Sequence, residues 1–166
     1  HLARASEQPP APAGMALTWV ARNTCRLCTR VLYQGATGGL PPHAGAYPQR
    51  LPIAHARQRF LQTEVESIDL ERKAVRTPDG DFPYDHLVLV PGSVTNDFGV
   101  PGVQQHALPM KSLSDGLHVR SRILGAFERA ARESDPERRT QLLSFVLIGA
   151  GPVGVETASS MRDLMD

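Results

Sequence analysis

The clearest hydrophobic pattern in the sequence has the period of an α-helix and lies between Ser112 and Glu133. Apolar residues recur there at helical spacing, which places them on one face of a helix. The residues of this expected apolar face are Leu113, Leu117, Leu124, Phe127 and Ala131. Ser112 followed by Asp115 resembles a capping box, with Asp in place of the usual Glu or Gln. The pattern therefore predicts a long helix that begins after Ser112.

Shorter runs of alternating or continuous apolar residues predict strands. Met15–Arg22 is expected to form one short strand. Phe60–Ile68 and Lys73–Arg76 are rich in Val, Ile and Leu on either side of the charged tip Asp69–Arg72, which predicts a β-hairpin or meander. The pair Asp79–Gly80 is a second turn signal, so the meander is expected to continue beyond it.

Two continuous apolar runs, Tyr84–Val90 and Gln141–Ile148, are typical of buried strands, and a helix is expected from Gly151 onward. Between the strands, Gly35–Gln49 is rich in glycine and proline and is predicted to be a loop with several sharp turns. His1–Gly14 is rich in alanine and proline without a hydrophobic period, which favours a disordered lead-in.

This order of strand, meander, strand, helix, strand, turn and helix predicts an α/β protein. The sequence ends within the helix that follows the last turn. Because a nucleotide-binding unit needs at least one more strand after that helix, we expect the chain to be a fragment.

A glycine motif with a chemical purpose lies in the segment FVLIGAGPVGVE at Phe145–Glu156. The residues from Gly149 to Gly154 match the pattern G-x-G-x-x-G, with Pro152 and Val153 between the last two glycines. The motif follows an apolar run and opens a helix, which is the context that a dinucleotide-binding turn requires. Gly149 permits the tight turn, Gly151 lets the backbone approach phosphate oxygens, and Gly154 allows close packing. The helix N-terminus then attracts a pyrophosphate, here assigned to NADH.

Two further features could carry chemistry. Glu156 is expected on the first turn of the motif helix, where the helix dipole favours a carboxylate, or else facing the nicotinamide as a catalytic residue. Cys25 and Cys28 form a C-x-x-C pair, but the sequence has no second pair of metal-ligand residues, so no metal site is expected. The acidic residue that would separate NAD from NADP lies about 20 positions beyond the turn, outside this sequence.

Charge and composition exclude several classes of protein. Lys and Arg total 18 against 17 Asp and Glu, for a net charge of +1 without a basic face, which argues against nucleic-acid binding. No apolar run approaches the roughly 20 residues of a membrane-spanning helix. The N-terminus lacks an export signal, and two cysteines cannot build a disulfide framework, so a reducing cytoplasmic setting is expected.

Four stretches together resemble the type II NADH dehydrogenases, the single-subunit flavoprotein NADH:quinone oxidoreductases. The HALPMKSL run that leads into the long arginine-rich helix is particularly specific to that family. The stretches are VLYQGATGGL at Val31–Leu40, EVESIDLERKAV at Glu64–Val75, YDHLVLVPGS at Tyr84–Ser93, and the region from Phe98 through Ala130 and the glycine motif to Ala158.

The resemblance implies a Rossmann-like flavoprotein with two dinucleotide sites, for FAD and NAD(P), and a β-meander insertion. It divides the chain into a lead-in at 1–16, a partial FAD-binding domain at 17–110 and the start of an NADH-binding domain at 111–166. It places the backbone of Val65 at the adenine of FAD, Gly92 close to FAD, and Gln34 near the flavin. Glu156 matches a carboxylate between nicotinamide and flavin, and the glycine turn at Gly149 holds NADH.

The same resemblance implies a quinone as electron acceptor and contact with the inner face of the plasma membrane through segments outside this sequence. It also allows a homodimer. The sequence departs from the family at several points: no glycine motif for FAD precedes Val31, Ala21 replaces an acidic ribose ligand, Pro91 replaces a threonine, and Cys25 and Cys28 stand where the family usually has aromatic residues. We therefore expect this chain not to retain FAD tightly and to be inactive by itself.

Two alternatives stay open at this point. The first is another pyridine-nucleotide flavoprotein, such as a ferredoxin or disulfide reductase, although the Cys25–Cys28 pair lies far from the glycine turn that it would serve. The second is an inactive nucleotide-binding remnant, which the missing FAD loop and Ala21 favour.

Overall fold

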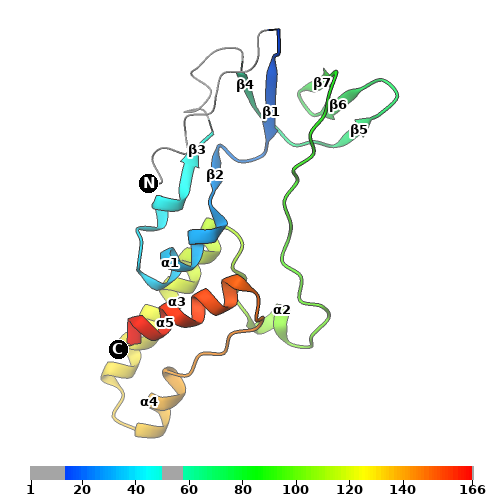
Figure 1. Cartoon of the computed structure of the whole chain (residues 1–166). Helices are drawn as coiled ribbons and strands as arrows, with labels where there is room; N and C mark the ends of the chain where they lie inside the picture. The colour runs from blue at the N-terminus through cyan, green and yellow to red at the C-terminus, as the bar shows by residue number, and fades with distance from the viewer. Residues whose placement is uncertain (1–13, 50–57, 166) are drawn as a thin grey trace. The chain divides into compact units, whose positions relative to one another are not determined.

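The computed structural model of the chain describes residues 14–49 and 58–165. The contacts between residues divide the chain into two compact units, one of His1–Arg26 and Tyr47–Gly92, the other of Leu27–Ala46 and Ser93–Asp166. Residues 1–13 of the predicted lead-in His1–Gly14 lie outside the described residues. Figure 1 shows the strands and helices along the chain.

The first unit contains a pair of parallel strands, β1 (Leu17–Ala21) and β4 (Gln58–Gln62), in which Trp19 lies opposite Phe60. The predicted strand at Met15–Arg22 is thus confirmed. Phe60 is buried, as expected for the middle of a strand that covers a core. A second pair of strands is formed by β2 (Cys25–Leu27) and β3 (Ala46–Pro48).

The predicted meander is present in the first unit. It consists of the antiparallel strands β5 (Ser67–Asp69), β6 (Ala74–Thr77) and β7 (Gly80–Pro83). Val75 is buried between Ile68 and Phe82, its partners on the two neighbouring strands. Both predicted turns are therefore confirmed, at the charged tip and at Asp79–Gly80.

The Asp79–Gly80 turn has a backbone that only glycine adopts readily, because φ of Gly80 is +122°. The Thr77 hydroxyl closes the turn by donating to the Gly80 carbonyl at 3.0 Å and accepting from the Asp79 N–H at 3.2 Å. Polar groups of the turn are therefore satisfied locally, as a short hairpin connection requires.

One strand assignment in this region is wrong. Phe60–Ile68 is not a single strand that pairs with Lys73–Arg76, because the chain leaves β4 after Gln62 and enters the meander only at Ser67. Phe60 instead pairs in parallel with β1. Alternating apolar residues predict a strand but do not identify its partner, and a parallel partner is distant in sequence.

The predicted buried strands at Tyr84–Val90 and Gln141–Ile148 are also absent. Val88 and Val90 are 83% and 84% exposed, and Val146 is 87% exposed. Gln141 and Leu142 belong to the preceding helix instead. A strand forms only against a neighbour that accepts and donates its backbone hydrogen bonds, and none of the described strands lies beside either run.

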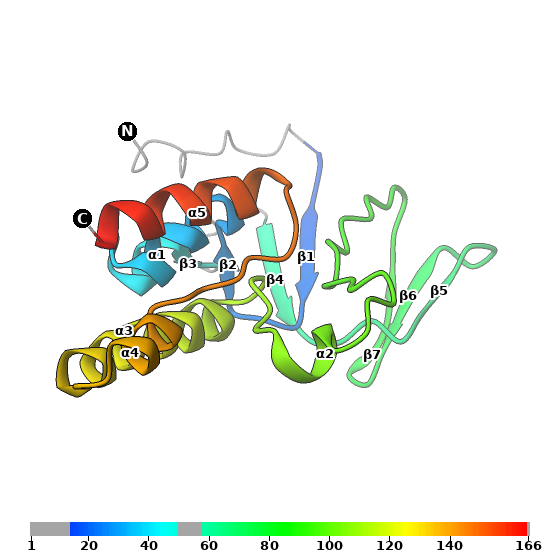
Figure 2. The same cartoon turned by 90° about the horizontal axis from the view of Figure 1, so that it is seen from below.

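The second unit is built from helices. They are α1 (Leu32–Thr37), α2 (Val103–His106), α3 (Leu113–Arg132), α4 (Pro136–Leu142) and α5 (Pro152–Met165). Figure 2 shows α1 between α3 and α5, and both helices contact it. The residues buried at these contacts are Leu32, Ala36, Ile123, Ala126, Ala130 and Met161.

The segment Gly35–Gln49 contains more structure than the predicted loop. Its first residues are the second half of α1, and a 3₁₀ turn at Pro42–Gly45 leads into β3. The helix ends at Gly38, whose φ of +91° is the left-handed conformation that favours glycine after a helix. Arg120 of α3 donates to the Gly35 carbonyl at 3.2 Å, which places a cation at the C-terminus of α1.

The long helix α3 confirms the predicted bounds, but its buried face differs from the predicted one. Leu117 and Leu124 are 43% and 42% exposed. The buried positions are instead Gly116, Ile123, Ala126 and Ala130, at equally helical spacing. Leu32 decides the face, because a Cβ on Gly116 would lie 2.7 Å from its Cδ1 atom. Small residues let α1 approach on that side.

The predicted capping box of α3 is confirmed. The Ser112 hydroxyl accepts from the Asp115 N–H at 3.1 Å, and the Asp115 carboxylate accepts from the Ser112 N–H at 2.7 Å. The carboxylate also accepts from the Lys111 N–H at 3.0 Å. Burial by itself would raise the pKa of Asp115, but the N–H groups of Ser112 and Lys111 outweigh it and hold the pKa below its usual 3.8.

Asp115→Ala is expected to lower the free energy of unfolding by about 1 kcal/mol, as is typical when a helix loses its N-terminal cap. Because folding lowers the pKa of Asp115, its ionised form stabilises the fold above pH 3.8, and this stabilisation is lost as the pH falls through the folded pKa. Urea unfolding of both proteins at neutral and acidic pH measures this. A difference in stability that stays constant into strong acid would contradict the assignment.

Candidate functional site

The glycine motif adopts a tight turn at the N-terminus of α5. Gly149 has a φ of +111°, a conformation that side chains rarely allow. The chain then folds back so closely that a Cβ on Gly154 would collide with the Gly149 carbonyl oxygen. The Val155 N–H donates to the Gly151 carbonyl at 3.1 Å, which begins the helical hydrogen bonds. Gly149 and Gly154 are therefore both required by the geometry of the turn.

The middle of the motif is open. A Cβ on Gly151 would meet no atom within 4 Å, and Gly151 and Pro152 are exposed. Pro152 is the first residue of α5, where its missing N–H costs no hydrogen bond. The first N–H groups of a helix have no partner within the helix and carry partial positive charge. The turn thus presents bare backbone and helix-end N–H groups to an anionic ligand.

The helix that follows, α5, is packed against another helix of the second unit. Thr157 and Met161 are each 6% exposed, and the Thr157 hydroxyl donates to the Val153 carbonyl at 2.6 Å. This face of α5 packs on α1 (Figure 2). Upstream of the turn, the ring of Phe145 lies edge-on to that of Phe127 in α3, with centroids 6.1 Å apart. The turn is thus supported on both sides without its predicted strand.

Glu156 lies in a different position from the predicted one. It is the fifth residue of α5, and the first turn of the helix contains no acidic residue. The expected stabilisation by the helix dipole is therefore wrong, because that effect falls off within the first turn. The side chain is exposed. Its catalytic role stays a prediction.

The other predicted cofactor residues fall in separate parts of the chain. Val65 and Gly92 belong to the first unit, whereas Gln34 and the glycine turn belong to the second. Val65 is 43% exposed just before β5, and Gly92 is exposed with a φ of +76°. Within the second unit, α1 brings Gln34 to the helix layer that also supports α5. The roles of these residues at FAD stay predictions.

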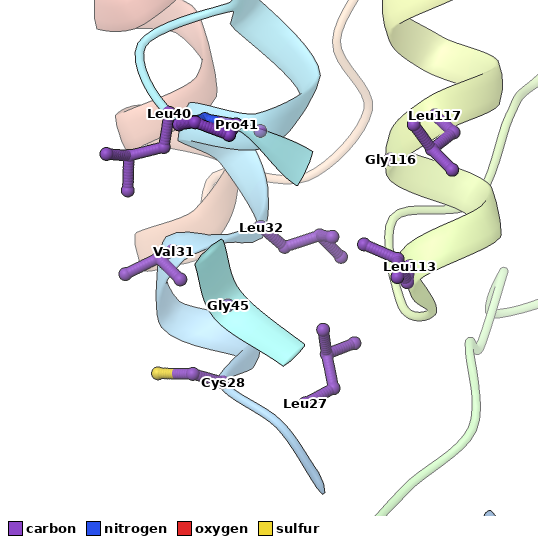
Figure 3. Close-up of a pocket in the computed structure, with 11 residues that line it drawn as sticks. Leu27, Cys28, Val31, Leu32, Leu40, Pro41, Gly45, Leu113, Gly116 and Leu117 are labelled. Atoms are coloured by element: carbon purple, nitrogen blue, oxygen red, sulfur yellow. The ribbon is translucent and has the colours of Figure 1, made fainter. Parts of the chain in front are cut away.

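The second unit also contains a small apolar pocket between α1 and α3, shown in Figure 3. None of the predicted site residues lines it. Leucine is the most frequent residue in its walls, and the side chains of Val31 and Leu32 lie close to Gly45 and Gly116. The lining residues are Leu27, Cys28, Val31, Leu32, Gly35, Leu40, Pro41, Gly45, Leu113, Gly116 and Leu117. The pocket is thus a packing feature of the helix layer, separate from the nucleotide turn.

The two cysteines of the C-x-x-C pair, Cys25 and Cys28, are not joined in a disulfide. Both thiols are free, with Cys25 exposed and Cys28 half-buried. Within residues 14–49 and 58–165, no group of three His, Cys, Asp or Glu side chains could hold a metal ion. In the same ranges, no helix combines the length and the apolar character that crossing a bilayer would require.

Two contacts near the site were missed by sequence reasoning. One is the hydrogen bond from Arg120 to the Gly35 carbonyl, described above. The other joins the Lys111 ammonium to the Ser93 hydroxyl at 2.6 Å. Both connect residues far apart in the sequence. Lys111 lies in the HALPMKSL run that carries much of the family resemblance, which was the available signal for its importance.

Comparison with known proteins gives a consistent result. The family model for pyridine nucleotide-disulphide oxidoreductases matches residues 3–166. The type II NADH:quinone oxidoreductase Ndh of Mycobacterium tuberculosis is 40% identical over 152 residues, covering 89% of this chain and 33% of that protein. NdhA of the same organism, also a type II NADH:quinone oxidoreductase, is 36% identical over 159 residues, covering 93% of this chain and 34% of its own length.

Among solved structures, NDH2 from Plasmodium falciparum in complex with NADH superposes with a TM-score of 0.78 at 22% identity, over 90% of this chain and 32% of that one. At this identity the likeness shows the fold, and it confirms the predicted α/β class. The resemblance to type II NADH dehydrogenases is also confirmed, and none of these relatives is named as a ferredoxin or disulfide reductase. The chain spans about a third of the length of these relatives.

Proposed function

This chain belongs to the pyridine nucleotide-disulphide oxidoreductase family, and from this membership we propose that it is part of an FAD-dependent NADH:quinone oxidoreductase. The names of its relatives support the reaction, as both M. tuberculosis proteins are type II NADH:quinone oxidoreductases. The observation that carries the proposal in this chain is the glycine turn at the start of α5, with its open backbone at Gly151.

In this proposal the turn binds the pyrophosphate of NADH. The residues fit that group, because the space that a Cβ would fill at Gly151 is free and the first N–H groups of a helix such as α5 have no partner within the helix. Gly149 and Gly154 act indirectly by keeping the turn tight. Packing of Thr157 and Met161 fixes the direction of α5, so the N–H groups are oriented before the nucleotide arrives.

For FAD, the described residues supply only part of a site. The resemblance expects Val65 to contact the adenine and Gly92 to contact the flavin, and both residues are exposed. A second glycine turn before a helix, which the FAD pyrophosphate would need, does not occur in residues 14–49 and 58–165. The expected weak retention of FAD by this chain follows from that difference.

The cofactors supply the redox chemistry, namely hydride transfer from NADH to flavin and electron transfer onward to quinone. The task of the protein is to bind, orient and exclude water. In the proposal, the carboxylate of Glu156 lies between the nicotinamide and the flavin. Glu156 follows Gly154, the last glycine of the turn, by two residues along α5. Contact with the inner face of the plasma membrane and assembly as a homodimer belong to the same proposal and rest on the family resemblance.

The proposal is tested by titrating the purified chain with NADH and by assaying the longest natural polypeptide that contains it with FAD, NADH and a soluble quinone analogue. We expect saturable NADH binding in the first experiment and NADH-dependent quinone reduction in the second. NADH binding without quinone reduction would favour the nucleotide-binding remnant. Absence of NADH binding would overturn the assignment of the turn.

A further inference from the structure

The segment that follows the meander is held in place by few interactions. Val88, Val90 and Val94 are 83%, 84% and 86% exposed. Of residues 85–95, only Ser93 takes part in a hydrogen bond or ion pair within the part of the chain that the structure describes. That bond comes from the Lys111 ammonium to the Ser93 hydroxyl, at 2.6 Å. One hydrogen bond therefore restrains Ser93, near the end of this segment.

Lys111 is itself firmly anchored. Its backbone N–H donates to the Asp115 carboxylate at 3.0 Å, so the capping box of α3 extends back to this residue. The Asp115 carboxylate faces the backbone of Lys111, and in the described residues the ammonium makes no ion pair. The side chain is half-buried, which limits its rotamers. The Lys111 ammonium thus donates to the Ser93 hydroxyl from a backbone that is itself hydrogen-bonded. Hydrogen bonds from a charged donor are stronger than those between neutral groups.

The residue next to Ser93 is Gly92, which the proposed function places beside the flavin. Gly92 has a φ of +76°, and a Cβ there would meet no atom within 4 Å. Glycine has the largest backbone freedom of any residue, so Gly92 does not fix this conformation by itself. A ligand that contacts its backbone would have to order it on binding unless another group had already done so.

We propose that Lys111 is a positioning residue, which holds Ser93 and thereby keeps the Pro91–Ser93 backbone in the conformation that contacts the flavin. This inference rests on the proposed function for the identity of the ligand. The tether itself does not, because it concerns the backbone of this chain alone. The side chain of Lys111 is not part of the capping box, so its removal leaves the bonds that stabilise α3.

The tether is tested in the ¹⁵N-labelled chain by backbone order parameters of Gly92, Ser93 and Val94. Lys111→Met and Ser93→Ala are each expected to lower these from about 0.85, the value of a rigid backbone, toward about 0.6. The double variant should lower them no further, because both changes remove the same bond. Lys111→Arg keeps a donor and should retain the rigid values. Arg122→Met, which removes an exposed cation of α3, is the matched control.

The role at the cofactor is tested by FAD titration of the longest natural polypeptide that contains this chain. Lys111→Met and Ser93→Ala should each raise the FAD dissociation constant about fivefold, as expected for the loss of one hydrogen bond. Arg122→Met should not. Unchanged order parameters, or additive effects in the double variant, would overturn the tether. Altered order parameters with unchanged FAD affinity would overturn its positioning role, whether or not the wild-type protein reduces quinone.

Discussion

Gly151→Val is expected to raise the dissociation constant for NADH at least about tenfold while the fold stays intact. A Cβ at this position would meet no atom within 4 Å, and the φ of Gly151 is not in the left-handed range, so we expect the free protein to accommodate valine. The same side chain would occupy the space through which the pyrophosphate approaches the backbone. The variant therefore separates the effect on the ligand from the effect on the fold.

The measurement is an NADH titration by calorimetry, with thermal unfolding of the same samples to show that the fold is unchanged. Ala158→Val is the matched control, since Ala158 is an exposed residue of α5 beyond the turn and the change introduces the same valine side chain. It should bind NADH like the wild type. If Gly151→Val bound NADH with wild-type affinity, the pyrophosphate of the nucleotide would not bind at this turn.

Gly154→Ala is expected to destabilise the protein even though it adds only one methyl group. The new Cβ would collide with the backbone carbonyl of Gly149, which cannot rotate away as a side chain could. Overpacking of this kind typically costs about 1–3 kcal/mol, and a backbone collision places this case at the upper end. For a chain of this size we expect the Tm to fall by about 5–10 °C.

Thermal unfolding followed by circular dichroism measures this, and Gly125→Ala is the matched comparison. Gly125 lies inside α3, where a Cβ would approach only the flexible end of Arg129, at 3.4 Å. Helix propensity then favours alanine by up to about 1 kcal/mol, so this variant should be as stable as the wild type or more so. If both glycine variants were stabilised alike, the close approach of Gly149 and Gly154 would not exist in solution.

Local signals allowed the parts of the site that depend on neighbours in sequence to be predicted. The turn from Gly149 to Gly154 has the predicted conformation, because its constraint is a backbone angle and a contact five residues away. The capping box at Ser112 and the turn at Asp79–Gly80 were predicted for the same reason. Sequence patterns failed wherever a distant partner decides the outcome.

The two missing strands illustrate this failure. Tyr84–Val90 and Gln141–Ile148 have the composition of buried strands, yet both runs lack a described neighbour and are largely exposed. The buried face of α3 is a second case. Leu117 and Leu124 are as apolar as Ile123, but α1 approaches on the side where Gly116 leaves room for Leu32. Glu156 is a separate, local case, because α5 begins at Pro152 and Glu156, its fifth residue, lies beyond the first turn.

The sequence by itself determined the glycine turn, the meander, the bounds of α3 and the family, since each is encoded in residues close together or in a contiguous motif. Only the tertiary structure decided that β1 pairs in parallel with β4, that α1 lies between α3 and α5, and that Lys111 bonds Ser93. These contacts join residues that are far apart along the chain. Their free energy depends on which surfaces fit together, a property that no local pattern contains.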